Sequence, residues 1–156
     1  MARIEVEKLN NDELDYWVAR AEGITHPPMM REMEPGFVMV SSSGSDEDGH
    51  FSCFVAYSPS TDWNIAGDII HREKIGLDTW QRQWGAQFTY ARPGAEDKFS
   101  PSHHRMLGET PMVAAMRTYV SLKFGPYFDV DENGNTTIAE RPERPKFKPL
   151  KQSSED

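Results

Sequence analysis

The chain has 156 residues, 37% of them hydrophobic, and carries 17 basic against 25 acidic residues for a formal net charge of −8. This length fits one domain with its own core, whereas the low apolar fraction predicts a substantial solvated part. The negative charge disfavours general binding to nucleic acid. The single cysteine, Cys53, cannot form an intramolecular disulfide and suits a reducing compartment. No stretch approaches the ~18 apolar residues of a spanning helix, so we expect a cytosolic protein without membrane association.

The N-terminal residues predict a strand followed by an amphipathic helix. Residues 3–7 alternate between polar and apolar side chains, as a half-buried strand does. Asn10 and Asn11 can accept hydrogen bonds from the first free amides of a helix. The apolar residues then follow the spacing of one helical face, and Gly23 is placed to end the helix in a left-handed conformation. That face consists of Leu14, Trp17, Val18 and Ala21.

Two strands are predicted next, on either side of an acidic segment. Residues 37–40 form a short apolar run, and residues 51–57 are apolar on nearly both faces, which is typical of a central strand. Residues 41–49, SSSGSDEDG, are small, polar and acidic, so we expect a mobile hairpin loop. Its carboxylates lack the alternating spacing of a calcium loop, and we predict no metal site there.

Residues 57–73, YSPSTDWNIAGDIIHRE, hold the densest group of special-purpose side chains in the chain. Pro59 favours a turn, Ser60 or Thr61 can cap a short helix through residues 62–64, and Gly67 can end it. These structural roles explain most of the stretch. The alternative is that the turn holds a small polar or planar ligand. The candidate ligand-binding residues are Tyr57, Ser58, Ser60, Thr61, Asp62, Trp63, Asn64, Asp68 and Arg72.

A further strand and an irregular insertion follow. The alternation of Trp84, Ala86, Phe88 and Tyr90 with polar residues predicts an amphipathic strand with an aromatic core face. Residues 92–108 are rich in turn formers. The insertion contains His103 and His104, but adjacent histidines without further ligand spacing do not predict a metal site.

The second long helix is predicted over residues 111–124. Thr110 is a suitable cap, proline suits the first helical position, and Gly125 suits the end. The expected buried face consists of Met112, Val113, Ala115, Met116, Tyr119, Val120 and Phe124.

We therefore predict an α+β fold: a small antiparallel sheet of about four or five strands packed by two amphipathic helices, with long irregular loops. The expected single domain covers residues 1–130. Residues 131–156 are expected to form an extended, disordered tail. Its stretch 141–151 has five basic residues against one acidic residue and is alternatively a docking arm for a partner. The uncovered sheet face, with Phe54 and Tyr57, is a candidate surface for a homo-oligomer.

Three separated blocks carry a family resemblance. Residues 57–63, with Gly67 and the isoleucine pair 69–70, resemble the signature of the NinX-like proteins of tailed bacteriophages. Residues 110–117 with 123–125 are similar to the closing helix of that family, and residues 14–23 are similar to its opening helix. Three blocks in the family's order are much more specific than one motif.

The resemblance implies a small accessory phage protein that is made in the infected bacterium and acts in the host cytoplasm. The family brings no catalytic residues and no cofactor to this chain. The chain departs from the family pattern at residues 65–66 and 68–69, where the family usually has a glutamine, an extra glycine and a proline. His71 stands where the family often has glutamate. These departures put a ligand common to the family in doubt.

Two classes of function remain. The first is stoichiometric binding, either of a nucleotide-type defence signal of the host or of a host protein. The second is a small hydrolase or transferase that uses Asp62, His71 and Asp68 for acid and base chemistry. Because Asp62 and His71 do not have a recognised catalytic spacing, the sequence favours binding and predicts no catalytic residue.

Overall fold

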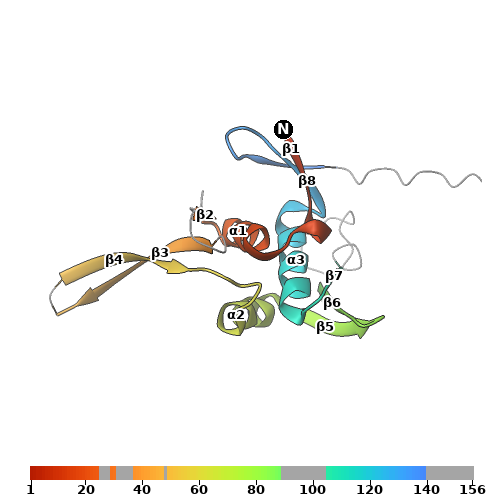
Figure 1. Cartoon of the computed structure of the whole chain (residues 1–156), viewed down its shortest axis with the longest axis horizontal. Helices are drawn as coiled ribbons and strands as arrows, with labels where there is room; N and C mark the ends of the chain where they lie inside the picture. The colour runs from red at the N-terminus through yellow and green to blue at the C-terminus, as the bar shows by residue number, and fades with distance from the viewer. Residues whose placement is uncertain (25–28, 31–36, 48, 89–104, 140–156) are drawn as a thin grey trace, which may run out of the picture.

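The structure, a computed structural model, describes residues 1–24, 29–30, 37–47, 49–88 and 105–139 (Figure 1). The helices within these residues are the 3-10 helix η1 (Val6–Lys8), α1 (Asn11–Ala21), α2 (Trp63–Glu73) and α3 (Pro111–Phe124). The strands are β1 (Ala2–Glu5), β2 (Met29–Met30), β3 (Phe37–Asp46), β4 (Gly49–Ala56), β5 (Ile75–Trp80), β6 (Gln83–Phe88), β7 (Met106–Gly108), β8 (Tyr127–Val130) and β9 (Thr136–Ile138).

The α+β class with antiparallel strands is confirmed, but the strands are divided among small sheets. In the described part of the chain they form three sheets of three strands each, in the orders β1-β8-β9, β2-β3-β4 and β5-β6-β7. Helix α3 runs between the β5–β7 sheet at one end and β8 at the other, with α1 and α2 beside it (Figure 1). The fold is therefore arranged around helix α3 and not around the single sheet that the sequence predicted.

Helix α3 is buried on more sides than its predicted apolar face. Thr110 caps it by accepting a hydrogen bond from the Val113 amide at 3.2 Å, and Gly125 ends it with a φ of +85°. These terminal predictions are confirmed. The fully buried residues include two hydroxyls, and the Thr118 hydroxyl lies 2.9 Å from the carbonyl oxygen of Ala86 on β6. The buried set is Ala114, Ala115, Met116, Thr118, Tyr119, Val120 and Ser121.

Helix α1 confirms the predicted N-terminal helix, with one correction at its cap. Leu14, Trp17 and Val18 are buried, and Gly23 has the expected positive φ of +90°. The side chain of Asn10 does not cap the helix. Its amide oxygen instead accepts a hydrogen bond from Arg117 of α3 at 2.7 Å, because α3 packs closely against the start of α1.

The acidic segment differs most from the sequence prediction. Residues 41–46 belong to β3 and residues 49–50 to β4, so the expected loop at 41–49 is a paired hairpin. The pairing runs from Met39 opposite Ala56 to Asp46 opposite Gly49, which gives each serine of β3 a backbone partner on an apolar strand. The expected central strand, β4, lies at the edge of its sheet in the described part of the chain. The hairpin projects away from the helices (Figure 1).

The C-terminal parts of the prediction also differ. The predicted strand at residues 83–90 corresponds to β6, whereas residues 106–108 of the expected insertion form β7. His103 and His104 lie outside the described residues. Strand β9 lies past the expected domain boundary at residue 130 and pairs with β8. Residues 140–156, including the basic stretch, are outside the described part.

Two glycines provide a matched test of this packing. A Cβ at Gly108 of β7 would lie 2.6 Å from the backbone nitrogen of Ala114 at the start of α3, whereas a Cβ at Gly67 of α2 would meet nothing within 4 Å. We expect Gly108→Ala to lower the free energy of unfolding by about 1–3 kcal/mol through overpacking. Gly67→Ala should raise it by about 0.5–1 kcal/mol, because alanine is the better helix former. Urea unfolding of both variants checks this, and equal effects would contradict the described contact between β7 and α3.

Candidate functional site

The turn after β4 is a compact, hydrogen-bonded structure. The Tyr57 amide still continues the hairpin by donating to the Val38 carbonyl at 2.8 Å. The amides of Thr61 and Asp62 both donate to the carbonyl oxygen of Ser58, at 3.0 and 2.8 Å. Pro59 is fully buried at the centre of the turn, as its predicted structural role requires. The backbone of residues 58–62 is therefore fixed by its own turn.

A buried carboxylate attaches this turn to α1. Asp15 is only 6% exposed, and its Oδ1 accepts a hydrogen bond from the Ser60 amide at 2.7 Å. Burial raises the pKa of Asp15 to about 6, and the nearby Asp12 carboxylate acts in the same direction, while the bond from Ser60 opposes the shift. The Ser60 residue is itself only 2% exposed. Asp15 thus fixes the turn at the expense of burying a negative charge.

Helix α2 is longer than the predicted short segment and has a different cap. The Asp62 carboxylate accepts from the Asn64 amide at 2.9 Å, so Asp62 is the cap, not Ser60 or Thr61. The helix continues through Gly67 to Glu73, and the residue that caps its end, Lys74, has a φ of +55°. The correction has a simple cause: the amides of Thr61 and Asp62 are already bonded to Ser58, so the first free amides belong to the residues that follow Asp62.

The candidate ligand-binding residues separate into two groups on α2 and the turn. The outward group is exposed, apart from the half-buried Asp62, and Trp63 is 52% exposed at the first residue of the helix. Asn64, Asp68 and His71 follow at i, i+4 and i+7, so they lie on one solvent-facing side of the helix. The outward group consists of the candidate ligand-binding residues Thr61, Asp62, Trp63, Asn64 and Asp68, together with His71 from the alternative acid–base pair.

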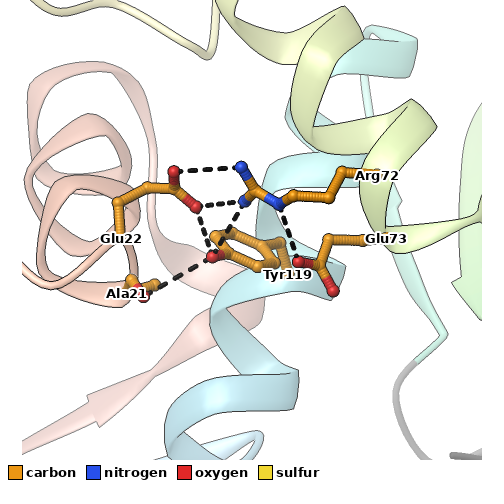
Figure 2. Close-up of polar contacts among 5 residues, drawn as sticks. All are labelled: Ala21, Glu22, Arg72, Glu73 and Tyr119. Carbon is orange, nitrogen blue, oxygen red and sulfur yellow. Dashed lines mark hydrogen bonds and ion pairs between the residues drawn. The ribbon is translucent and has the colours of Figure 1, made fainter.

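The second group consists of Tyr57, Ser60 and Arg72, which lie on the side of the other helices. Arg72 makes most of the contacts of this group with α1 and α3 (Figure 2). The Arg72 guanidinium forms a two-pronged ion pair with Glu22 at the end of α1, one prong measuring 3.3 Å. It also donates to Glu73 at 3.0 Å and to the Tyr119 hydroxyl of α3 at 3.4 Å. Figure 2 shows Glu22, Arg72 and Tyr119 converging from three helices. Tyr119 in turn donates a hydrogen bond to Glu22.

The charges in this group reinforce one another. The hydrogen bond to Glu22 raises the pKa of Arg72 above its usual value. Burial and then the bond to Glu22 raise the pKa of Tyr119, so its hydroxyl stays protonated. Burial, with the nearby charges of Glu22 and Asp15, does the same for Tyr57. The cluster is an ion-paired contact among three helices, and the Arg72 fork already binds the Glu22 carboxylate.

The structure therefore does not gather the candidates into one place. Tyr57, Ser60 and Arg72 lie on the inward side, whereas Trp63 and its neighbours lie outward. Asp62 at the cap and His71 near the end of α2 are nine residues apart, which separates them by roughly 13 Å along the helix axis. The proposed acid–base pair is thus not assembled. Among the described residues no group of three or more side chains has metal-ligand placement.

Sequence reasoning missed three residues that organise the site, namely Asp15, Glu22 and Tyr119. The first two appear in the sequence as ordinary charged residues of an exposed helix, and Tyr119 as one of several apolar positions. Only Asp15 gave a signal, because an acidic residue directly beside the apolar positions Leu14 and Trp17 is unusual. Their partners are distant in sequence, so their roles require the tertiary structure.

The raised pKa of Asp15 gives a pH prediction. Its folded-state pKa of about 6 exceeds its ordinary value of 3.8, so its contribution to stability is fully present below pH 3.8 and is lost as the pH rises through 6. Asp15→Asn keeps an acceptor for Ser60 but removes the charge. We expect the wild-type protein to gain on the order of 2–3 kcal/mol relative to Asp15→Asn between pH 7.5 and pH 4. Urea unfolding of both proteins at each pH measures this difference.

The control is Asp15→Ala, which removes the acceptor as well as the charge. It should lie below Asp15→Asn in stability at every pH, by about 1–3 kcal/mol, because the buried Ser60 amide is left without a partner. If the stability difference between wild type and Asp15→Asn did not change with pH, the carboxylate would not be buried as described.

Comparison with known proteins identifies the family. The chain matches the family model described as "Bacteriophage P22, NinX" over residues 5–123, which span α1, the turn, α2 and nearly all of α3. A search of curated proteins gives no match. None of the helices in the described residues is long and apolar enough to cross a membrane. The resemblance seen in the three sequence blocks is confirmed. The chain belongs to the bacteriophage P22 NinX family of phage accessory proteins.

Proposed function

We propose that the protein acts in the cytoplasm of the infected bacterium as a stoichiometric binder that blocks a host protein, with a component of host defence as the expected target. The binding surface is the outward group of the turn and α2, with Trp63 at its centre. The observation that carries this proposal is the 52% exposure of the Trp63 side chain on a tightly fixed part of the chain.

An exposed tryptophan on a rigid scaffold is well suited to binding. Large aromatic side chains contribute most of the affinity at many protein interfaces. The backbone beside Trp63 is held by the Asp62 cap and by the hydrogen bond from the Ser60 amide to Asp15, so little conformational entropy is lost when a partner binds. Asn64 and Asp68 are also exposed on α2 and can donate and accept hydrogen bonds with a bound partner.

The charges near Trp63 favour a protein over a nucleotide-type molecule. Asp62 and Asp68 carry negative charge on the exposed side of α2, and Arg72, the cation expected to bind phosphate, is paired with Glu22 on the other side. A polyphosphate would be repelled from this surface, whereas a partner with basic or neutral polar side chains fits it. Capture of a nucleotide-type signal is therefore the alternative, and the second experiment below distinguishes it from binding of a host protein.

The matched variants Trp63→Ala and Trp80→Ala test the proposal. Trp80 on β5 is 53% exposed, so its removal controls for the loss of an exposed indole. We expect Trp63→Ala to weaken binding of host proteins by about 30-fold or more, as loss of a central interface residue does, and Trp80→Ala to leave it unchanged. Quantitative pulldown from host lysate with the three proteins measures this. Equal retention of the same proteins by Trp63→Ala would overturn the proposed surface.

A parallel measurement separates the other functions. The purified protein is incubated with nucleotide signals and then heated, and the released molecules are identified by mass spectrometry. Release of intact nucleotide from wild type and not from Trp63→Ala would replace the host protein by a small molecule as the ligand. Release of altered nucleotide would establish a reaction and contradict stoichiometric binding.

A further inference from the structure

The β3–β4 hairpin leaves long strand edges uncovered in the described part of the chain. Strand β2 pairs only with Phe37 and Val38, at the first two residues of β3. The rest of the hairpin extends away from the helices (Figure 1). A pair of strands without further cover is only marginally stable in water. A hairpin of this length therefore gains stability if a further strand pairs with it.

The hydrogen-bond pattern shows which backbone groups of β4 are available. The Tyr57 amide donates to Val38, so Tyr57 and Val38 form a hydrogen-bonded pair of the antiparallel ladder. Hydrogen-bonded and non-hydrogen-bonded pairs alternate along such a ladder. Phe51, Cys53 and Val55 consequently direct their backbone groups toward β3. The groups directed to the open edge are those of His50, Ser52, Phe54 and Ala56.

The open edge of β4 lacks the usual protection of an exposed strand. Natural edge strands commonly contain lysine or other charged residues, or proline, which has no amide hydrogen to donate, and these residues prevent pairing with another chain. The sequence of β4, GHFSCFVA, contains neither lysine, proline nor a carboxylate. The free part of β3 is rich in serine, with Gly44 and Asp46, residue types that are less favourable in strands. The edge of β4 is therefore the better candidate for pairing.

We propose that two copies of the chain pair along β4 in antiparallel orientation, about a two-fold axis that passes through Cys53. Symmetric pairing must join residues whose backbone groups both face the open edge. An axis at Cys53 meets this condition by pairing His50 with the partner's Ala56 and Ser52 with the partner's Phe54. An axis at Ser52 also meets it, but leaves the backbone groups of Ala56 without a partner. The axis at Cys53 forms more hydrogen bonds.

The register has consequences for both the sheet face and the site. The backbone of Phe51 lies opposite that of the partner's Val55, and that of Cys53 lies opposite that of the partner's Cys53, so the two hairpins form one continuous sheet. The pairing also places the partner's Gly49 opposite Tyr57. The acidic hairpin tip of one copy thus reaches the start of the turn in the other, and a partner residue is placed beside the candidate site.

Oxidative cross-linking tests the register, because Cys53 is the only cysteine of the chain. Directly opposed residues of a non-hydrogen-bonded pair have Cα atoms about 4.5 Å apart, within the range of a disulfide. We expect copper-phenanthroline to convert the folded protein into a dimer of twice the 17.8 kDa chain mass, at a concentration where the urea-unfolded chain stays monomeric. A folded dimer that cross-links no faster than the unfolded chain would overturn the register.

Two matched proline variants test the edge itself. Ser52 of β4 and Ser43 of β3 are opposite each other in a non-hydrogen-bonded pair, so each directs its amide toward the outer edge of its own strand. Ser52→Pro should abolish the dimer in light scattering without breaking the β3–β4 ladder, whereas Ser43→Pro should leave the dimer intact. Ser52→Lys, which places a charge on the same edge, gives the same test if Ser52→Pro does not fold. A monomeric wild type, or a dimer lost only in Ser43→Pro, would overturn the proposal.

Discussion

The position of the turn relative to α1 depends on one hydrogen bond, from the Ser60 amide to the buried carboxylate of Asp15. Without an acceptor on α1, the segment between β4 and α2 would be held only by its own turn. With it, the first residue of α2 has a fixed position relative to α1, and Asp62 completes the cap. A buried carboxylate is costly, and its raised pKa expresses that cost. Its position argues for a requirement on the geometry of the turn rather than on stability alone.

The contacts around α3 extend this constraint to the rest of the molecule. Glu22, Arg72 and Tyr119 join α1, α2 and α3 at one point (Figure 2). At the opposite end of α1, Arg117 donates to the carbonyl of Leu9 at 3.0 Å and to that of Leu107 on β7 at 2.6 Å. The contacts of Arg72 hold one side of α2 against α1 and α3. The other side of α2 faces solvent. The division of the candidate residues follows from this arrangement.

The helices could be predicted from sequence because their determinants are local. Thr110, the apolar spacing of α1 and the positive-φ glycine at position 23 act within a few residues, and the structure confirms them. The cap of α2 and the division into small sheets could not be predicted, since Asp62 becomes the cap only after two amides bond to Ser58. The serine-rich part of β3 is stabilised by pairing with β4, which its composition does not reveal. Arg72 was predicted as a candidate ligand-binding residue, whereas the structure pairs it with Glu22, which lies 50 residues away in sequence.

Hydrogen exchange at the Ser60 amide, followed by NMR in the wild-type protein, tests the central claim most directly. If the bond to Asp15 fixes the turn, this amide should exchange as slowly as the core amides of α3 and should open only with global unfolding. The exposed amide of Glu47 at the hairpin tip supplies the fast reference within the same sample. Exchange of the Ser60 amide at the rate of that reference would show that the turn is not held by α1, and the account of a preformed binding surface would fail.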